Sequence, residues 1–256
     1  MDLGCFHKYI AFYAYINCCK TNSSLYGAIK SEFERGLNMN KEWSELNKTM
    51  QAQIKKKDTY KMGIDTLFNL RRQLMQTLVS FKEDLCREDF NAIPFINADG
   101  YHSKTIAYSI WHIFRIEDIV AHTVITEDEQ VFFTGNYQVR INSPIITTGN
   151  ELVKQQIADF SKQLNLEELY SYIFEVREST EKILERFSYD ELKWKIPDER
   201  KGYLKSLNVV NCDEKAIWLI DYWCNKDICG LIQMPFSRHW IMHTEACLRI
   251  KNKMHS

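Results

Sequence analysis

Residues 59–86 read TYKMGIDTLFNLRRQLMQTLVSFKEDLC, and this stretch decides the fold class. Its apolar residues recur at intervals of three and four, which places them on one face of a helix. These residues are Met62, Leu67, Leu70, Leu74, Leu78, Phe81 and Leu85. We expect the charged residues Arg71, Arg72, Lys82 and Glu83 on the opposite face, in solvent. The segment therefore predicts a long amphipathic helix that packs against other elements.

Three further segments show the same helical periodicity. They cover about residues 103–126, residues 166–187, and a last helix that begins at Pro235 and runs to about residue 253. A shorter helix rich in tryptophan is expected over residues 213–224. Four long amphipathic helices with extended connections between them predict an all-α fold, a four-helix bundle.

The scarcity of turn residues agrees with a helical fold. The 256 residues include only 9 Gly and 4 Pro, whereas an all-β chain needs a turn about every 8–12 residues. Residues 91–100 and 198–212 are expected to be irregular. Residues 127–150 mix β-forming residues with Gly and Pro, which predicts a long crossover outside the helices, with a short strand as one alternative.

Charge and cysteine content narrow the range of partners. The 33 Lys and Arg against 34 Asp and Glu give a net charge of −1, which argues against a continuous basic face for nucleic acid.

The longest apolar stretch, residues 9–19, is about half of what a bilayer crossing needs, so no membrane span is expected. The eight cysteines form no CxxC pair, which favours reduced thiols in a cytoplasmic protein. A homodimer is a further expectation, because bundles with an aromatic-rich exposed face often pair.

The first 38 residues are expected to be a leader of separate status, with the bundle domain over residues 39–256. From Met39 the chain opens with the polar, helix-forming stretch MNKEWSELNKTMQAQIKKK, whereas residues 1–38 show no comparable periodic face. Residues 34–36 (ERG) can also be encoded by a purine run like a bacterial ribosome-binding site. We therefore hypothesise that translation starts at Met39, which mapping the amino terminus of the native protein would test. A signal peptide is the weaker alternative, since no small-x-small site follows the apolar stretch.

The sharpest local motif is RHWIMH, residues 238–243. Its two histidines, His239 and His243, are four apart and hence about 40° apart around a helix, so both imidazoles can share one cation. Chance gives such a pair in about one chain of this composition in five or six. A third ligand is therefore needed before the motif predicts a metal site.

His112 is the best third ligand. It lies in the middle of a predicted helix and is expected to point into the bundle, where an unpartnered imidazole would be costly. Three neutral imidazoles would leave a fourth position on the metal open, as in catalytic sites. His102 and His122 are weaker candidates, because each lies ten residues from His112 and about 80° off its face. His7 and His255 lie near the termini.

The stretch SIWHIFRIED (residues 109–118), followed near the end of the chain by the pair His239 and His243, resembles the DinB/YfiT superfamily of four-helix-bundle metalloproteins. That family carries one histidine on its second long helix and two, four apart, on its last. The resemblance covers about residues 60–253. It implies that His112, His239 and His243 bind a divalent ion, usually zinc or nickel.

The resemblance also implies an activity. Relatives include enzymes that join bacillithiol or mycothiol to electrophiles, or that use such a thiol to isomerise maleylpyruvate. The expected partners are thus a low-molecular-weight thiol and a small electrophile. After the last ligand this chain reads Thr244-Glu245-Ala246 where Gly-Gln commonly follows, which leaves both substrates open. The alternative function is a non-catalytic stress-response or interaction protein in which the histidines, or a metal that they bind, are structural.

Other side chains have both a functional and a structural interpretation. Arg115, one turn past His112, could bind a substrate carboxylate bidentately or pair with a carboxylate of the bundle. Cys247 could approach the metal as a ligand or reactive thiol, or belong to the core. The aromatic run Trp218, Tyr222 and Trp223 could line a pocket mouth or pack in the core. The sequence contains no HExxH motif, which argues against a zincin protease. It also contains no GxGxxG or GxxxxGK[ST] motif, so nothing indicates a nucleotide site.

Overall fold

The computed structural model describes residues 40–255, and over that range the chain is all-α. No strand forms there, although an isolated bridge joins Lys195 and Asp227. Residues from Leu46 onward fold as one compact unit. The predicted leader, residues 1–38, lies outside the described residues. Among the described helices, none combines the length and the apolar character that a bilayer crossing requires.

The helical elements of the described residues follow in one order along the chain. A helix over residues 40–54 is followed by α3 (Tyr60–Asp84), α4 (Arg87–Asn91), η1 (Gly100–His102), α5 (Ile106–Asp118), η2 (Ile119–Thr126), α6 (Val131–Thr134), α7 (Tyr137–Ile141), α8 (Gln155–Gln163), α9 (Leu166–Arg186), η3 (Glu191–Lys193), α10 (Glu199–Ser206), α11 (Glu214–Cys224), α12 (Ile228–Ile232), η4 (Met234–Arg238) and α13 (His239–Met254). Here η1 and η3 are 3₁₀ turns, whereas η2 and η4 are π-helical. The four long helices predicted from periodicity therefore form, two of them with a π-helical segment at one end.

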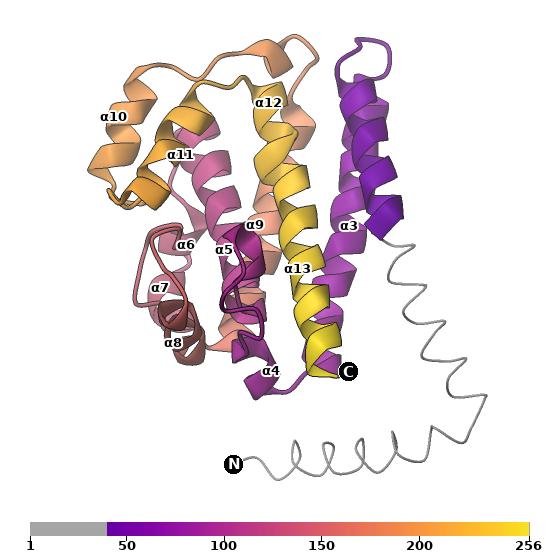
Figure 1. Cartoon of the computed structure of the whole chain (residues 1–256). Helices are drawn as coiled ribbons and strands as arrows, with labels where there is room; N and C mark the ends of the chain where they lie inside the picture. The colour runs from indigo at the N-terminus through magenta and orange to yellow at the C-terminus, as the bar shows by residue number, and fades with distance from the viewer. Residues whose placement is uncertain (1–39, 256) are drawn as a thin grey trace, which may run out of the picture. The chain divides into compact units, whose positions relative to one another are not determined.

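The long helices α3, α5, α9 and α13 contact one another in a ring (Figure 1). Each of α3 and α5 packs against both α9 and α13. Helix α5 is buried along its whole length, so it forms the centre of the unit. A side chain in the middle of α5 is therefore held by packing on all sides.

Neighbouring helices in this ring run parallel in two places. The contacts of Tyr172 with Asp118 and of Ser179 with His122 show that α9 runs in the same direction as α5. Helices α3 and α13 are also parallel, as the contact between their carboxyl-terminal residues Asp84 and Lys251 shows. Parallel neighbours cannot be joined by a short loop, which explains the long connection over residues 127–165 between α5 and α9. A second long connection, over residues 187–233, joins α9 to α13.

The predicted alternative of a strand within residues 127–150 is wrong. The carboxylate of Asp118 accepts hydrogen bonds from the backbone N–H groups of Val131 and Phe132, both at 2.9 Å. A carboxylate at this position favours a helical turn, because it satisfies the free N–H groups at the start of α6. Residues 199–206 form α10 and are not irregular as expected. The expected loop is confirmed over residues 92–99, between α4 and η1.

The expectation for Arg71 is also wrong. Arg72, Lys82 and Glu83 are exposed as predicted, but Arg71 is fully buried. Its guanidinium donates two hydrogen bonds to the buried Glu117 of α5, at 2.8 and 2.9 Å. A bidentate partner on a neighbouring helix makes burial of the charge possible, which the pattern of one helix could not reveal.

Candidate metal centre

The structure brings the three predicted imidazoles together in the interior. His239 and His243 lie one turn apart on α13, and His112 faces them from α5, which runs antiparallel to α13. The ring centroids are 4.6 to 5.0 Å apart, and one nitrogen of each ring lies within 4.8 Å of the other two. This spacing leaves the three side chains able to hold a single metal ion.

A backbone carbonyl fixes the orientation of the His112 ring. Its Nδ1 lies 2.6 Å from the carbonyl oxygen of Thr148, which can only accept a hydrogen bond. Nδ1 therefore carries the proton, and the lone pair is on Nε2, which faces His239 Nε2 at 3.3 Å. Such a second interaction of a ligating histidine sets its tautomer and raises its affinity for metal.

The loop that supplies this carbonyl is held by three side chains of α5. The Tyr108 hydroxyl donates to Gly149 O at 2.9 Å, His112 donates to Thr148 O, and Arg115 donates twice to Ile146 O, at 2.8 and 3.0 Å. These donors are spaced by about one helical turn, so α5 positions the loop at three successive levels. No sequence pattern indicated this interaction, because its partners are separated by more than 30 residues.

Gly149 provides a test of how strongly this loop supports the site. Its φ is +76°, and an added Cβ would lie only 2.8 Å from Trp111 Cζ3 and 3.0 Å from Tyr108 Cε2. Gly149→Ala is therefore expected to displace the loop, lowering the free energy of unfolding by about 1–3 kcal/mol and the zinc affinity by about tenfold. Urea unfolding and a zinc competition titration measure the two effects. Gly202→Ala is the matched control, since no atom lies within 4 Å of its Cβ position. Unchanged zinc affinity in the Gly149 variant would show that Thr148 does not support the site.

All three imidazoles are held neutral at physiological pH. Burial lowers the pKa of His239 to about 4. Burial, together with repulsion from the neighbouring imidazoles, lowers the pKa of His112 and His243 well below the ordinary value. Neutral imidazole is the form that binds metal, so no proton has to be displaced at pH 7.

Two nitrogens of the cluster have no partner. Nδ1 of His239 and Nδ1 of His243 are buried, and no described residue forms a hydrogen bond with either atom. A buried polar atom without a partner typically costs about 1–3 kcal/mol. A cation held among the three rings would satisfy one nitrogen of each ring, so the donor set fits a metal ion.

The three histidines also line a cavity of about 780 Å³. Trp218, Tyr222 and Trp223 of α11 form part of its wall, as one of the two sequence interpretations expected. Trp218 is half exposed, whereas Trp223 is buried. The volume and the mixture of aromatic and polar walls are typical of sites for small ligands.

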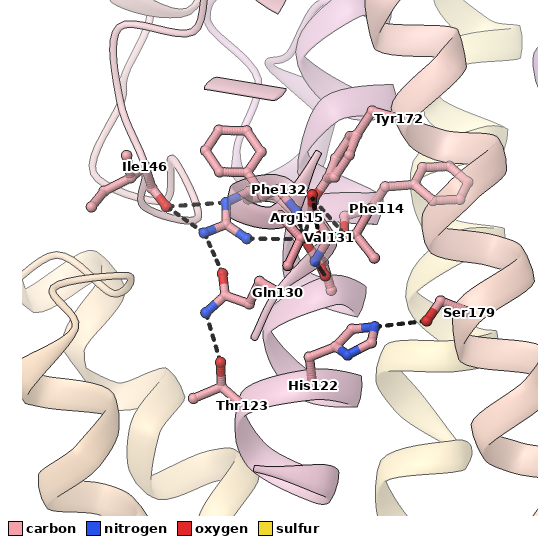
Figure 2. A network of polar contacts seen from close by, with 12 residues as sticks. Phe114, Arg115, His122, Thr123, Gln130, Val131, Phe132, Ile146, Tyr172 and Ser179 are labelled. Atoms are coloured by element: carbon pink, nitrogen blue, oxygen red, sulfur yellow. Dashed lines mark hydrogen bonds and ion pairs between the residues drawn. The ribbon is translucent and has the colours of Figure 1, made fainter. Parts of the chain in front are cut away.

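Arg115 has a structural role in this arrangement and does not line the cavity. It is fully buried, and Figure 2 shows its guanidinium enclosed by Ile146 O, by the side-chain oxygen of Gln130 at 2.7 Å and by the ring of Phe132. A further contact joins it to Asp118 at 3.6 Å. Of the two interpretations of Arg115, pairing within the bundle is therefore the one that the structure shows. The contacts of Arg115 hold the loop beside His112.

Neither rival histidine belongs to the cluster. His102 accepts a hydrogen bond from Arg249 at 2.8 Å. His122 Nε2 lies 3.0 Å from the Ser179 hydroxyl (Figure 2). Its Nδ1 lies 2.6 Å from the carboxylate of Asp128. This order of groups is that of a nucleophile, base and acid. However, Ser179 lies inside α9, where backbone N–H groups are bonded within the helix and cannot stabilise an oxyanion. His7 lies outside the described residues.

Cys247 belongs to the core. It is fully buried, and burial raises the pKa of its thiol to about 12, so the thiol stays protonated at neutral pH. It is not among the residues that line the cavity. It is also absent from the group of ligand atoms that lie within 4.8 Å of one another, so its place in the fold is in the core and not in the histidine cluster.

No protein-family model and no curated protein sequence matches the chain. Inferences about function therefore depend on the residues of the site and on the arrangement of the helices.

Proposed function

We propose that the protein is a metal-dependent thiol transferase of the DinB/YfiT type, in which His112, His239 and His243 bind one divalent cation, zinc or nickel. The observation that carries the proposal is the convergence of three buried, neutral imidazoles at the wall of a cavity of about 780 Å³. When bound, such a cation lowers the pKa of a thiol and stabilises its thiolate at neutral pH.

The residues of the chain have separate tasks in this proposal. The three imidazoles would supply three ligands to the cation at the wall of the cavity, and Thr148 O keeps His112 in the metal-binding tautomer. The aromatic side chains of α11 shield part of the cavity from water. In the proposed reaction, a small thiol loses its proton to solvent water and its sulfur forms a bond to a carbon of the electrophile. The leaving group departs with the electron pair of the broken bond.

The arrangement of the helices supports the family assignment within this proposal. Four long helices contact one another in a ring, with two parallel pairs and two long connections. One histidine comes from the second long helix, α5, and two come from the last, α13. This is the distribution that the resemblance implied.

A non-catalytic function is the second candidate, and one contact favours it. His112 Nε2 and His239 Nε2 lie 3.3 Å apart, close enough for a hydrogen bond if one of them carries the proton. The rings could then partly satisfy each other without metal, and the cluster would serve only to join α5 and α13. Removal of metal tests whether the cluster binds a metal, and a thiol-dependent rate distinguishes the catalytic candidate from the non-catalytic one.

Zinc removal is expected to lower the melting temperature. A ligand that binds only the folded state stabilises it by about 2.7 kcal/mol when its free concentration is a hundred times Kd. For a unit of this size the shift corresponds to about 5–10 °C. Differential scanning fluorimetry with added zinc, and again with a chelator, measures it. A melting temperature that is the same in both conditions would contradict the metal site.

Catalysis is tested by thiol conjugation. Zinc- or nickel-loaded protein is assayed with a panel of small thiols and monobromobimane, whose bromide is the leaving group. We expect a rate that depends on both metal and thiol, that is lost in His239→Ala and that is retained in His102→Ala. No thiol-dependent rate above the protein-free background would overturn the catalytic proposal and leave the binding function.

A further inference from the structure

The cavity beside the histidines carries an excess of positive charge. Its lining includes the cations Lys104, Lys154 and Lys215, against one carboxylate, Asp99. Lys215 has a counter-ion outside the lining, since its ammonium lies 3.9 Å from Asp213. A ligand that enters this cavity therefore meets a wall that favours negative charge.

Lys104 is the lysine that the fold places most definitely. Its ammonium lies 5.1 Å from the centre of the Tyr108 ring, and that ring stacks on the ring of His112 with 5.3 Å between centroids and 14° between planes. The Tyr108 hydroxyl is in turn fixed by Gly149 O. Lys104, Tyr108 and His112 thus form a stack, which holds the ammonium on the same side of α5 as the metal-binding imidazole.

The Lys104 ammonium lacks a counter-ion. No described residue forms a hydrogen bond or an ion pair with it. The ammonium makes a cation–π contact with the Tyr108 ring. The side chain is half-buried, and this burial is unfavourable for the charge. A cation in this position is expected to bind an anion strongly, because water competes less for it than at the surface.

A second polar group in the wall also lacks a partner. The side-chain oxygen of Asn150 is buried, and it has no hydrogen-bond partner among the described residues. The Lys104 ammonium matches a singly charged carboxylate, and the Asn150 amide oxygen, which can only accept, matches a hydroxyl or amine of the same ligand.

We propose that the thiol substrate carries a carboxylate and that Lys104 binds this carboxylate beside the metal centre. The proposal rests on the proposed function and specifies the substrate class of the same site. It transfers to Lys104 the role that the sequence suggested for Arg115, which the fold uses to hold a loop. Lys104 is thus a specificity-determining residue of the binding step.

The test compares a thiol acid with its neutral counterpart. Isothermal titration calorimetry of the zinc-loaded protein is carried out with 3-mercaptopropionate and with 3-mercapto-1-propanol. We expect the acid to bind about tenfold more tightly or better, as a charge-assisted hydrogen bond implies. Lys104→Met should abolish this preference without weakening the alcohol, and Lys104→Arg should restore most of it. Lys182→Met, which removes the same charge from an exposed position on α9, is the matched control.

A second arm separates this proposal from the metal site. Zinc-free protein is titrated with succinate and with 1,4-butanediol, neither of which contains a thiol. Preference for succinate that disappears in Lys104→Met supports the carboxylate site even if the metal site fails. A preference for the thiol acid that persists in Lys104→Met would show that the carboxylate binds elsewhere, for example to the metal, and would overturn the proposal. Equal affinity for acid and alcohol in the wild type would also overturn it.

Discussion

Replacing His239 with alanine is expected to weaken zinc binding by at least about a hundredfold. Loss of a residue that hydrogen-bonds to a metal ligand typically weakens metal binding by about tenfold to a hundredfold, and loss of the ligand itself should weaken it more. His239 lies within reach of both other imidazoles and is buried. A competition titration against a chromophoric chelator measures the affinity. The stabilisation by zinc should disappear together with the binding.

The stability of the zinc-free variant distinguishes a metal ligand from a structural histidine. In the metal-free protein His239 Nδ1 is buried and without a partner among the described residues, so its removal should cost little stability. His102→Ala is the matched control: it removes a histidine near the cavity that is hydrogen-bonded to Arg249 and lies outside the cluster. Equal zinc affinity in the two variants, or unfolding of the His239 variant without metal, would favour the structural interpretation.

Arg71→Met is expected to lower the free energy of unfolding by about 3–5 kcal/mol, because it leaves a buried carboxylate without its charged partner. Both Arg71 and Glu117 are fully buried. Glu117 would keep only the hydrogen bond from Trp240 Nε1, at 2.7 Å. The loss of Arg71 also removes its contact with the Trp240 ring, 4.4 Å away. Urea unfolding in the absence of metal measures the change.

Two further variants test the cause of this loss. The double variant Arg71→Met/Glu117→Gln removes both charges and keeps an acceptor for Trp240, so it should recover much of the lost stability. Lys182→Met breaks an exposed pair with Glu178 and should change stability little. A small effect of Arg71→Met, or no recovery in the double variant, would show that the pair does not stabilise the unit.

This buried pair also positions two residues of the candidate metal centre. Glu117 lies on α5 and Trp240 on α13, one residue after His239. Their hydrogen bond fixes the position of α13 along α5, and with it the position of His239 opposite His112. We therefore expect Arg71→Met to reduce zinc affinity as well as stability.

The parts of the fold that could be predicted from the sequence are those with a local cause. The apolar periodicity of α3, α5, α9 and α13 depends only on residues three and four apart, and Pro235 marks the start of the last helix. The inward direction of His112 follows from its position on α5, and the spacing of His239 and His243 places both on one face. These two observations were sufficient to expect that the three imidazoles meet.

The features that could not be predicted depend on contacts distant in sequence. Val131 and Phe132 have high strand propensity, but the carboxylate of Asp118 captures their N–H groups and begins a helix. The charge of Arg71 suggested that its side chain lies in solvent. The side chain is instead buried, because its partner Glu117 comes from another helix. Thr148 supports His112 through its backbone, so its side-chain type carries no signal.

X-ray absorption spectroscopy of the zinc-loaded protein tests the central claim most directly, because it counts the imidazoles around the metal. The account predicts three imidazole nitrogens at about 2.0–2.1 Å and one further oxygen or nitrogen donor. Addition of a small thiol should replace that donor with sulfur at about 2.3 Å. A shell with fewer than three imidazoles, or with sulfur before any thiol is added, would contradict a centre built from His112, His239 and His243.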